Sequence, residues 1–61
     1  MNPYMRTYIE GAVAYLKTFE QSLRMAALED DGRIDKQEQK IIDRTKKLTD
    51  KYVKGLEKLI E

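Results

Sequence analysis

One stretch, Glu29-Asp30-Asp31-Gly32-Arg33-Ile34-Asp35-Lys36-Gln37-Glu38, divides the chain into two arms. Its strongest break is Asp31-Gly32, because glycine readily adopts the positive φ that a tight reversal needs. Asp35 stands three residues before Glu38, a spacing typical of the capping box at the start of a helix. The stretch therefore predicts a turn followed directly by the start of a second helix.

Both arms carry the apolar spacing of an amphipathic helix. In the first arm, the a and d positions of an uninterrupted heptad pattern are Met5, Ile9, Ala12, Leu16, Phe19, Leu23 and Ala26. In the second arm the same spacing gives Glu38, Ile41, Thr45, Leu48, Tyr52, Gly55 and Leu59, and the apolar band is widened by Ile42, Val53, Leu56 and Ile60. Asn2 can cap a helix whose first residue is Pro3. We expect helices over about residues 3–28 and 36–60, with a turn over about 29–35.

The two apolar patterns mirror each other across the turn. In an antiparallel hairpin that reverses near Gly32, facing positions sum to 64, which pairs Met5 with Leu59, Ile9 with Gly55, Ala12 with Tyr52, Leu16 with Leu48, Phe19 with Thr45 and Leu23 with Ile41. Large side chains face small ones in three of these layers, as interdigitating layers require. The predicted fold is all-α, with one antiparallel helical hairpin over residues 1–61 as a single domain.

A lone hairpin of this size would be marginal. The chain has 61 residues and no cysteine, so disulfides cannot stabilise it. At about 100° per residue the apolar positions of each arm cover roughly 140° of arc, more than two helices need to meet. Ordering costs about 1.5 kcal/mol per residue, which two helices alone rarely offset. We expect a homodimer that forms a four-helix bundle; the alternative is that the same band packs on a larger partner.

The turn region resembles an EF-hand calcium loop over residues 27–38. With Gly32 at loop position 6, the resemblance implies as possible calcium ligands Glu29, Asp31, Asp35 and Glu38. Position 1, normally the first carboxylate of the cage, is Ala27. The alternative is a plain connection in which Asp35 and Glu38 cap the second helix and Ile34 closes the end of the bundle. We expect weak calcium binding or none, and no cofactor.

A row of cationic residues follows the second arm. It consists of Lys36, Lys40, Arg44, Lys47, Lys51, Lys54 and Lys58. These residues fall within about 80° of arc, roughly opposite the apolar band, and would suit an anion such as the phosphates of a nucleic acid. The other interpretation is a solvated helix face, in which Asp43 and Asp50 pair with Lys47 and Lys54 at i,i+4 and partly neutralise the row.

An aromatic edge flanks the apolar pattern of the first arm. Tyr4, Tyr8, Tyr15 and Phe19 follow one another at helical spacing, with Gly11 and two alanines among them. Tyrosine combines an apolar body with a polar tip, and aromatic residues beside small ones are typical of interface hot spots. The edge is therefore a candidate partner-binding site; the alternative is that these rings only fill the margin of the dimer core.

No catalytic group is apparent. Carboxylate pairs such as Glu10 with Glu20 or Asp43 with Asp50 fall on solvent faces, where nothing would exclude water from a reaction. Helical hairpins also offer little concavity for a substrate. We expect a non-enzyme. The chain contains neither a signal-peptide core nor an apolar run near 18 residues, so the expected location is the cytoplasm, without a membrane partner.

In length and architecture the chain resembles small regulatory helical hairpins that dimerise into four-helix bundles, among them the Rop type of RNA-binding plasmid regulator. The resemblance is one of shape and implies no site residue. The leading hypothesis is a homodimeric regulator, adaptor or inhibitor that binds another protein through the aromatic edge. The second is a nucleic-acid binder that uses the cationic row, and the third is a calcium-responsive module.

Overall fold

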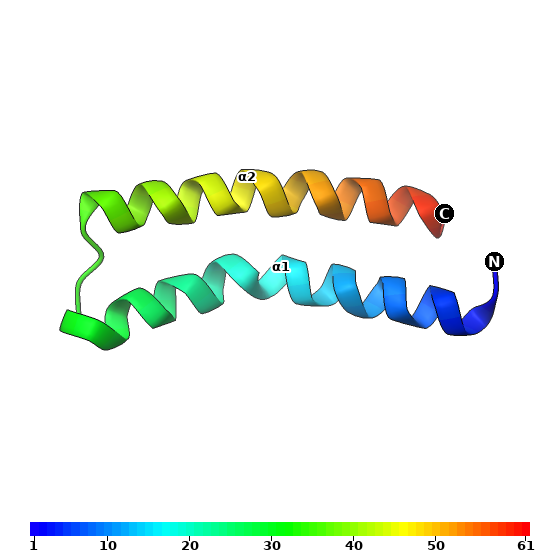
Figure 1. The fold of residues 1–61 in the computed structure, drawn as a ribbon, viewed down its shortest axis with the longest axis horizontal. Coiled ribbons are helices and arrows are strands. Elements are labelled where there is room, and N and C mark those ends of the chain that lie inside the picture. The colour runs from blue at the N-terminus through cyan, green and yellow to red at the C-terminus, as the bar shows by residue number, and fades with distance from the viewer.

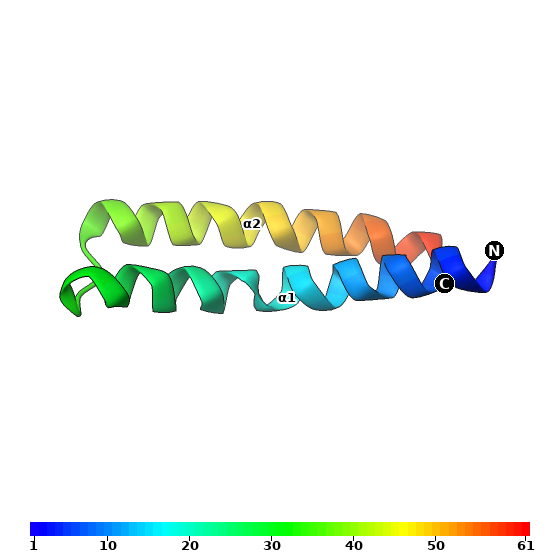
Figure 2. The ribbon, with the colours of Figure 1, turned by 60° about the horizontal axis from the view of Figure 1, so that its bottom comes forward.

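The computed structural model describes all 61 residues and contains two long helices. Helix α1 spans Pro3–Asp31 and helix α2 spans Lys36–Leu59. The helices run antiparallel, side by side, with both chain ends at the end of the molecule away from the turn (Figures 1 and 2). The Cα atoms extend over 45 × 18 × 9 Å, so the hairpin is one helix thick. The all-α helical hairpin is confirmed.

Both helices begin where the sequence predicts. The Asn2 side chain accepts hydrogen bonds from the backbone N–H groups of Tyr4 and Met5, at 2.7 and 3.2 Å. At α2, Asp35 Oδ1 accepts from the Glu38 N–H at 2.7 Å, and Glu38 Oε1 accepts from the Asp35 N–H at 3.0 Å. Both helices therefore begin with their first unpaired donors satisfied.

Helix α1 ends later than expected. The predicted end near residue 28 is wrong, because Glu29, Asp30 and Asp31 continue the helix. Acidic side chains do not break a helix, whereas Gly32 takes the left-handed conformation at φ 75° and donates its N–H to the Leu28 carbonyl at 2.9 Å. Such a cap closes the helix immediately before the glycine. The connection is reduced to residues 32–35, and α2 ends at Leu59, one residue before the predicted end.

The expected register between the helices is also wrong. The facing positions are shifted by one residue, and a neighbouring flank of α2 faces α1. The buried and half-buried positions along the line of contact are Ile9, Val13, Leu16, Glu20, Leu23 and Ala27 on α1, and Glu38, Ile42, Thr45, Thr49, Val53 and Leu56 on α2. The half-buried Phe19, Arg24 and Gln39 lie to either side of this line. Matched across the hairpin, the positions along the line of contact sum to 65 or 66 instead of 64.

Four of the seven α2 residues that the spacing places at the helix–helix seam, all of them large and apolar, are on the surface. Ile41, Leu48, Tyr52 and Leu59 are between 53% and 68% exposed. Shorter or β-branched side chains, among them Ile42, Thr45 and Val53, face α1 instead, and short side chains allow two helices to approach closely. Bulky Leu48 and Tyr52 therefore project from the side of the hairpin.

The hairpin buries very little. Only Val13, Ile42 and Val53 are buried, three of 61 residues. A small domain depends on buried apolar area to offset the entropy of ordering its chain. The positions that would complete a core are the exposed apolar side chains beside the seam.

Candidate interaction surfaces

One broad face of the hairpin carries polar contacts between the two helices. Lys17 Nζ lies 3.4 Å from Glu57 Oε2, which joins the two helices. Near the turn, Arg24 Nη1 donates to Gln39 Oε1 at 3.4 Å and Arg24 Nη2 lies 3.3 Å from Glu20 Oε1. Because both inter-helix contacts lie on the same flank of their helices, they define one side of the hairpin, here called the polar face.

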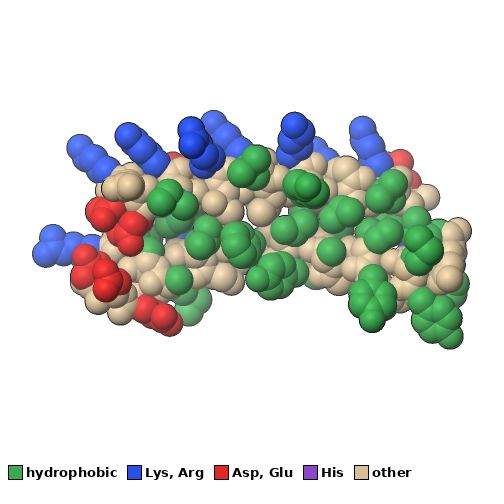
Figure 3. Space-filling view, viewed as in Figure 1, with side chains coloured by type: hydrophobic (Ala, Val, Ile, Leu, Met, Phe, Trp, Pro, Cys, Tyr) green, Lys and Arg blue, Asp and Glu red, His purple; other side chains and the backbone are tan.

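The opposite side is the apolar face. It consists of Met5, Ala12, Phe19 and Ala26 from α1 and Ile41, Leu48, Tyr52, Gly55 and Leu59 from α2, which fall on the flank away from Lys17 and Glu57 at about 100° per residue. Figure 3 shows this face: apolar side chains extend along both helices over nearly the whole length, bordered by cationic side chains along the outer edge of α2. A continuous apolar surface of this kind marks an interaction site.

Two hollows interrupt the apolar face. The first, about 420 Å³, lies on α2 and is lined by Leu48, Lys51, Tyr52, Gly55 and Leu56. The second, about 270 Å³, lies between the helices near the turn and is lined by Leu23, Ala26, Ala27, Glu38, Ile41 and Ile42. In the first, residues 48, 51, 52 and 55 stand at i, i+3, i+4 and i+7, the arrangement that receives a side chain of a neighbouring helix in knobs-into-holes packing.

Sequence reasoning expected apolar bands wider than the contact between the two helices, but it did not identify which residues form this face. Its α2 members were assigned to the contact between the two helices of one chain. The signal was present in the double apolar stripe of α2, where Ile41 stands beside Ile42 and Tyr52 beside Val53. Such pairs give a helix two adjacent apolar flanks, and only one of them can face α1.

The predicted aromatic edge, from here on called the tyrosine edge, lies along the outer margin of α1. Tyr4, Tyr8 and Tyr15 are 79%, 83% and 65% exposed. Phe19 is half-buried, and its ring centroid lies 5.9 Å from that of Tyr15 at an interplanar angle of 46°. A Cβ added at Gly11 would meet nothing within 4 Å, so the edge is open there. Its role in partner binding stays a prediction.

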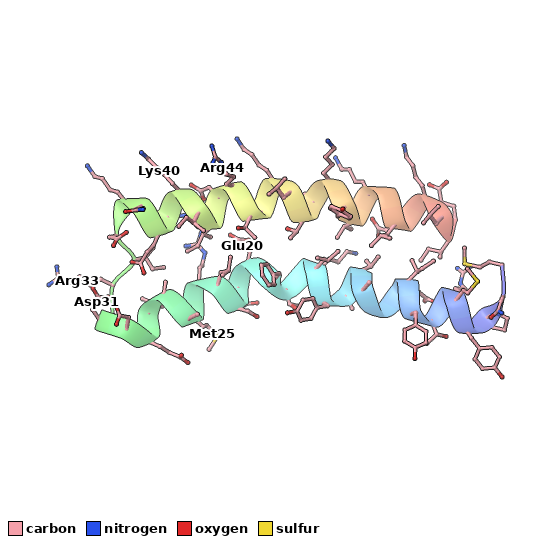
Figure 4. The ribbon with its side chains drawn as sticks, viewed as in Figure 1. Glu20, Met25, Asp31, Arg33, Lys40 and Arg44 are labelled. Atoms are coloured by element: carbon pink, nitrogen blue, oxygen red, sulfur yellow. The ribbon has the colours of Figure 1, made fainter.

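The cationic row lies along the outer edge of α2. All seven side chains are exposed and none forms an ion pair or a hydrogen bond. The expected neutralising pairs are wrong: Asp43 accepts from Gln39 Nε2 at 2.9 Å, and Asp50 pairs with Lys46 at 3.3 Å. Figure 4 shows Lys40 and Arg44 pointing away from α1. The row is therefore more open to an external anion than the sequence suggests.

The four carboxylates of the EF-hand resemblance do not converge. Glu29 and Asp31 belong to α1, and Asp31 accepts from the Arg33 N–H at 3.0 Å. Asp35 and Glu38 are engaged with each other in the capping box. The structure contains no group of three or more acidic side chains placed to hold a metal ion.

Neither helix combines the length and the apolar character that crossing a membrane requires. No protein-family model, curated protein or solved structure matches the chain.

Proposed function

We propose that the protein is a non-enzymatic interaction protein that works as a homodimer. A second copy covers the apolar face, and the dimer binds another protein through the tyrosine edge. The observation that carries the proposal is the contrast between the two broad faces. One is closed by polar contacts between the helices, and the other leaves Leu48, Tyr52 and Leu59 mostly exposed.

The size of the apolar face fits a dimer interface. The hairpin measures 45 by 18 Å between Cα atoms, so one broad face covers about 800 Å², the usual contribution of each partner to a stable interface. At a thickness of 9 Å the hairpin is a single layer of helices, and stable folds pack at least two layers around a core. A second copy supplies the missing layer and completes a four-helix bundle.

The tyrosine edge remains at the margin of such a dimer. Tyr4 and Tyr8 project from the outer side of α1 and are the most exposed aromatic side chains of the chain. Tyrosine supplies a large, rigid contact area with a polar tip, which suits recognition of another protein. We assign the binding of a partner protein to this edge.

Sedimentation equilibrium of matched variants tests the dimer. Leu48 and Met25 have similar exposures, 59% and 63%, but Leu48 lies on the apolar face and Met25 points away from α2 (Figure 4). We expect Leu48→Ala to raise the dimer dissociation constant at least tenfold and Met25→Ala to leave it unchanged. A wild-type chain that stays monomeric at micromolar concentration, with a melting temperature independent of concentration, would contradict the proposal.

The partner-binding edge is tested separately, by capture of proteins from the native host on the tagged dimer. Tyr8→Ala should lose more than about 1 kcal/mol of the binding free energy for the captured protein. Met25→Ala, which removes a 63% exposed side chain outside both surfaces, should lose little. Equal losses in the two variants would remove the tyrosine edge from the proposal.

A second candidate function is binding of a nucleic acid through the cationic row, because none of its seven cations is paired within the chain. A phosphate-binding surface gives an affinity that falls steeply with salt. Replacing Lys47 and Lys51 with alanine should reduce the salt slope by about one unit per lost phosphate contact. Lys46, which pairs with Asp50, provides the control substitution.

A further inference from the structure

We propose that the second copy packs on the apolar face with its turn at the opposite end of the bundle, so that α1 lies on α1 and α2 on α2. The inference rests on the homodimer proposed above and adds its orientation. In this arrangement a two-fold axis runs perpendicular to the helices, within the plane of the interface, and every residue pair occurs twice.

The spacing of α1 on the apolar face is symmetric about its own midpoint. Its four members are Met5, Ala12, Phe19 and Ala26. Paired end to end, Met5 with Ala26 and Ala12 with Phe19, the residue numbers sum to 31. In two antiparallel copies of α1, each large side chain therefore meets an alanine, the alternation that lets layers interdigitate.

The four large side chains of α2 on the apolar face show the same symmetry. Ile41 with Leu59 and Leu48 with Tyr52 sum to 100. The α2 midpoint is therefore position 50, and the α1 midpoint lies between Tyr15 and Leu16. Residues of α1 and α2 that lie at the same height along the hairpin have residue numbers that sum to 65. The α1 midpoint, 15.5, therefore lies at the height of position 49.5 on α2. The axis positions indicated by α1 and by α2 therefore differ by only half a residue, about 0.8 Å along the helix.

The hollows of the apolar face fit this axis. Leu48 of the second copy falls at the level of Tyr52, within the hollow that Leu48, Lys51, Tyr52 and Gly55 line. Met5 of the second copy falls at the level of Ala26, beside the hollow between the helices. Each copy thus offers one apolar side chain for each hollow of the other, as knobs-into-holes packing requires.

The alternative dimer, with both turns at one end, fits less well. It places α1 of one copy on α2 of the other, and residues that meet must have numbers that sum to 65. The available apolar pairs are Met5 with Leu59, Ala12 with Tyr52, Phe19 with Leu48 and Ala26 with Ile41, and their sums range from 64 to 67. This dimer also gathers the two acidic segments Glu29–Asp31 at one end, where like charges repel.

The proposed orientation also decides what the dimer presents at its edges. The cationic rows of both copies share one edge, and the tyrosine edges of both copies share the other. The rows point outward along the plane of the hairpin, so the repulsion between them is screened at ordinary salt and grows as salt is removed. The two candidate partner surfaces are therefore on opposite sides of one bundle.

Cysteine cross-linking tests the orientation, because the chain has no cysteine of its own. Tyr15 and Lys51 are exposed, border the apolar face and lie near the proposed axis. In the proposed dimer, Tyr15→Cys and Lys51→Cys each link to their own kind with a short bis-maleimide. A mixture of Tyr15→Cys with a mass-tagged Lys51→Cys then gives only the two self-linked products. The alternative dimer gives the mixed product, because 15 and 51 sum to 66.

A distance measurement at the turn provides a second, non-perturbing readout. Arg33 is exposed in the connection between the helices (Figure 4). Spin labels on Arg33→Cys should be about 45 Å or more apart in the proposed dimer, at 1.5 Å per residue, and about 10–20 Å apart if the turns share one end, given the usual separation of packed helices.

The outcomes separate the two proposals. A dimer with the mixed cross-link or a short Arg33 distance, or a dimer in which neither cysteine variant self-links, overturns the orientation and leaves the homodimer standing. A chain that is monomeric by sedimentation overturns both.

Discussion

The two broad faces of the hairpin come from the same two helices but are stabilised in different ways. The polar face is joined by Lys17 with Glu57 and by Arg24 with Gln39. The apolar face has no such contact, and all of its bulky side chains except Phe19 are exposed. The contrast shows that a helix with a wide apolar band can serve two interfaces, one within the chain and one outside it, and that each face can be tested separately.

The largest expected effect separates two adjacent isoleucines. Ile42 is 2% exposed at the seam and Ile41 is 53% exposed on the apolar face. Truncation of a buried isoleucine costs about 2–5 kcal/mol, so Ile42→Ala should lower the free energy of unfolding by that amount in urea titrations. Ile41→Ala should cost less in dilute protein and weaken the dimer at higher concentration. An equal or greater loss from Ile41→Ala in dilute protein would reverse the assignment of the two flanks.

The next effect concerns the hollow beside Gly55. A Cβ added at Gly55 or at Gly11 meets nothing within 4 Å in the single hairpin, and both substitutions raise helix propensity equally. If a second copy fills the hollow, Gly55→Leu should weaken the dimer by about 1–3 kcal/mol through overpacking, whereas Gly11→Leu should not. Sedimentation of both variants checks this, and a dimer unaffected by Gly55→Leu would exclude that hollow from the interface.

Sequence patterns predicted the fold and the first residue of each helix, because each depends on local chemistry. Asn2, Gly32 and the Asp35–Glu38 pair act through their own backbone neighbours, so their positions in the sequence are sufficient. The register of the hairpin depends on which of two adjacent stripes of α2 faces α1. Periodicity does not distinguish Ile41 from Ile42, and the outcome depends on how closely two helices pack once both are formed.

Some of the candidate surfaces could be predicted from the sequence and others could not, for the same reason. The tyrosine edge and the cationic row were recognisable from helical spacing alone, because each is a single stripe of one helix. The width of the apolar bands indicated an uncovered apolar surface, but the residues of the apolar face were not identified, because the face joins flanks of both helices. The pairing of Asp43 and Asp50 was also mispredicted, since each has an alternative partner one turn earlier, at Gln39 and Lys46. Spacing rules admit both choices equally.

The cap at the start of α2 lies on neither face, so its removal should lower the stability of the chain without affecting the dimer interface. Asp35 Oδ1 accepts the Glu38 N–H at 2.7 Å, and loss of such a cap costs about 0.5–2 kcal/mol. Asp35→Ala should destabilise the chain by that amount without changing the cross-linking pattern of the dimer. Asp43→Ala, which removes an exposed carboxylate held only by Gln39, is the matched control. Equal melting temperatures for the two variants would contradict a role for the capping box.

The smallest expected effect lies on the polar face and concerns Lys17 and Glu57. Their side chains are 58% and 47% exposed, and their charged atoms are 3.4 Å apart. Exposed ion pairs contribute between about 0.2 and 1 kcal/mol, so a double-mutant cycle with Lys17→Ala and Glu57→Ala should give a coupling energy in that range that decreases with added salt. The dimer dissociation constant should not change, because the polar face lies opposite the proposed interface. A cycle in which the substitutions weaken the dimer as strongly as Leu48→Ala would place the second copy on the polar face, and the contrast between the two faces would then lose its functional meaning.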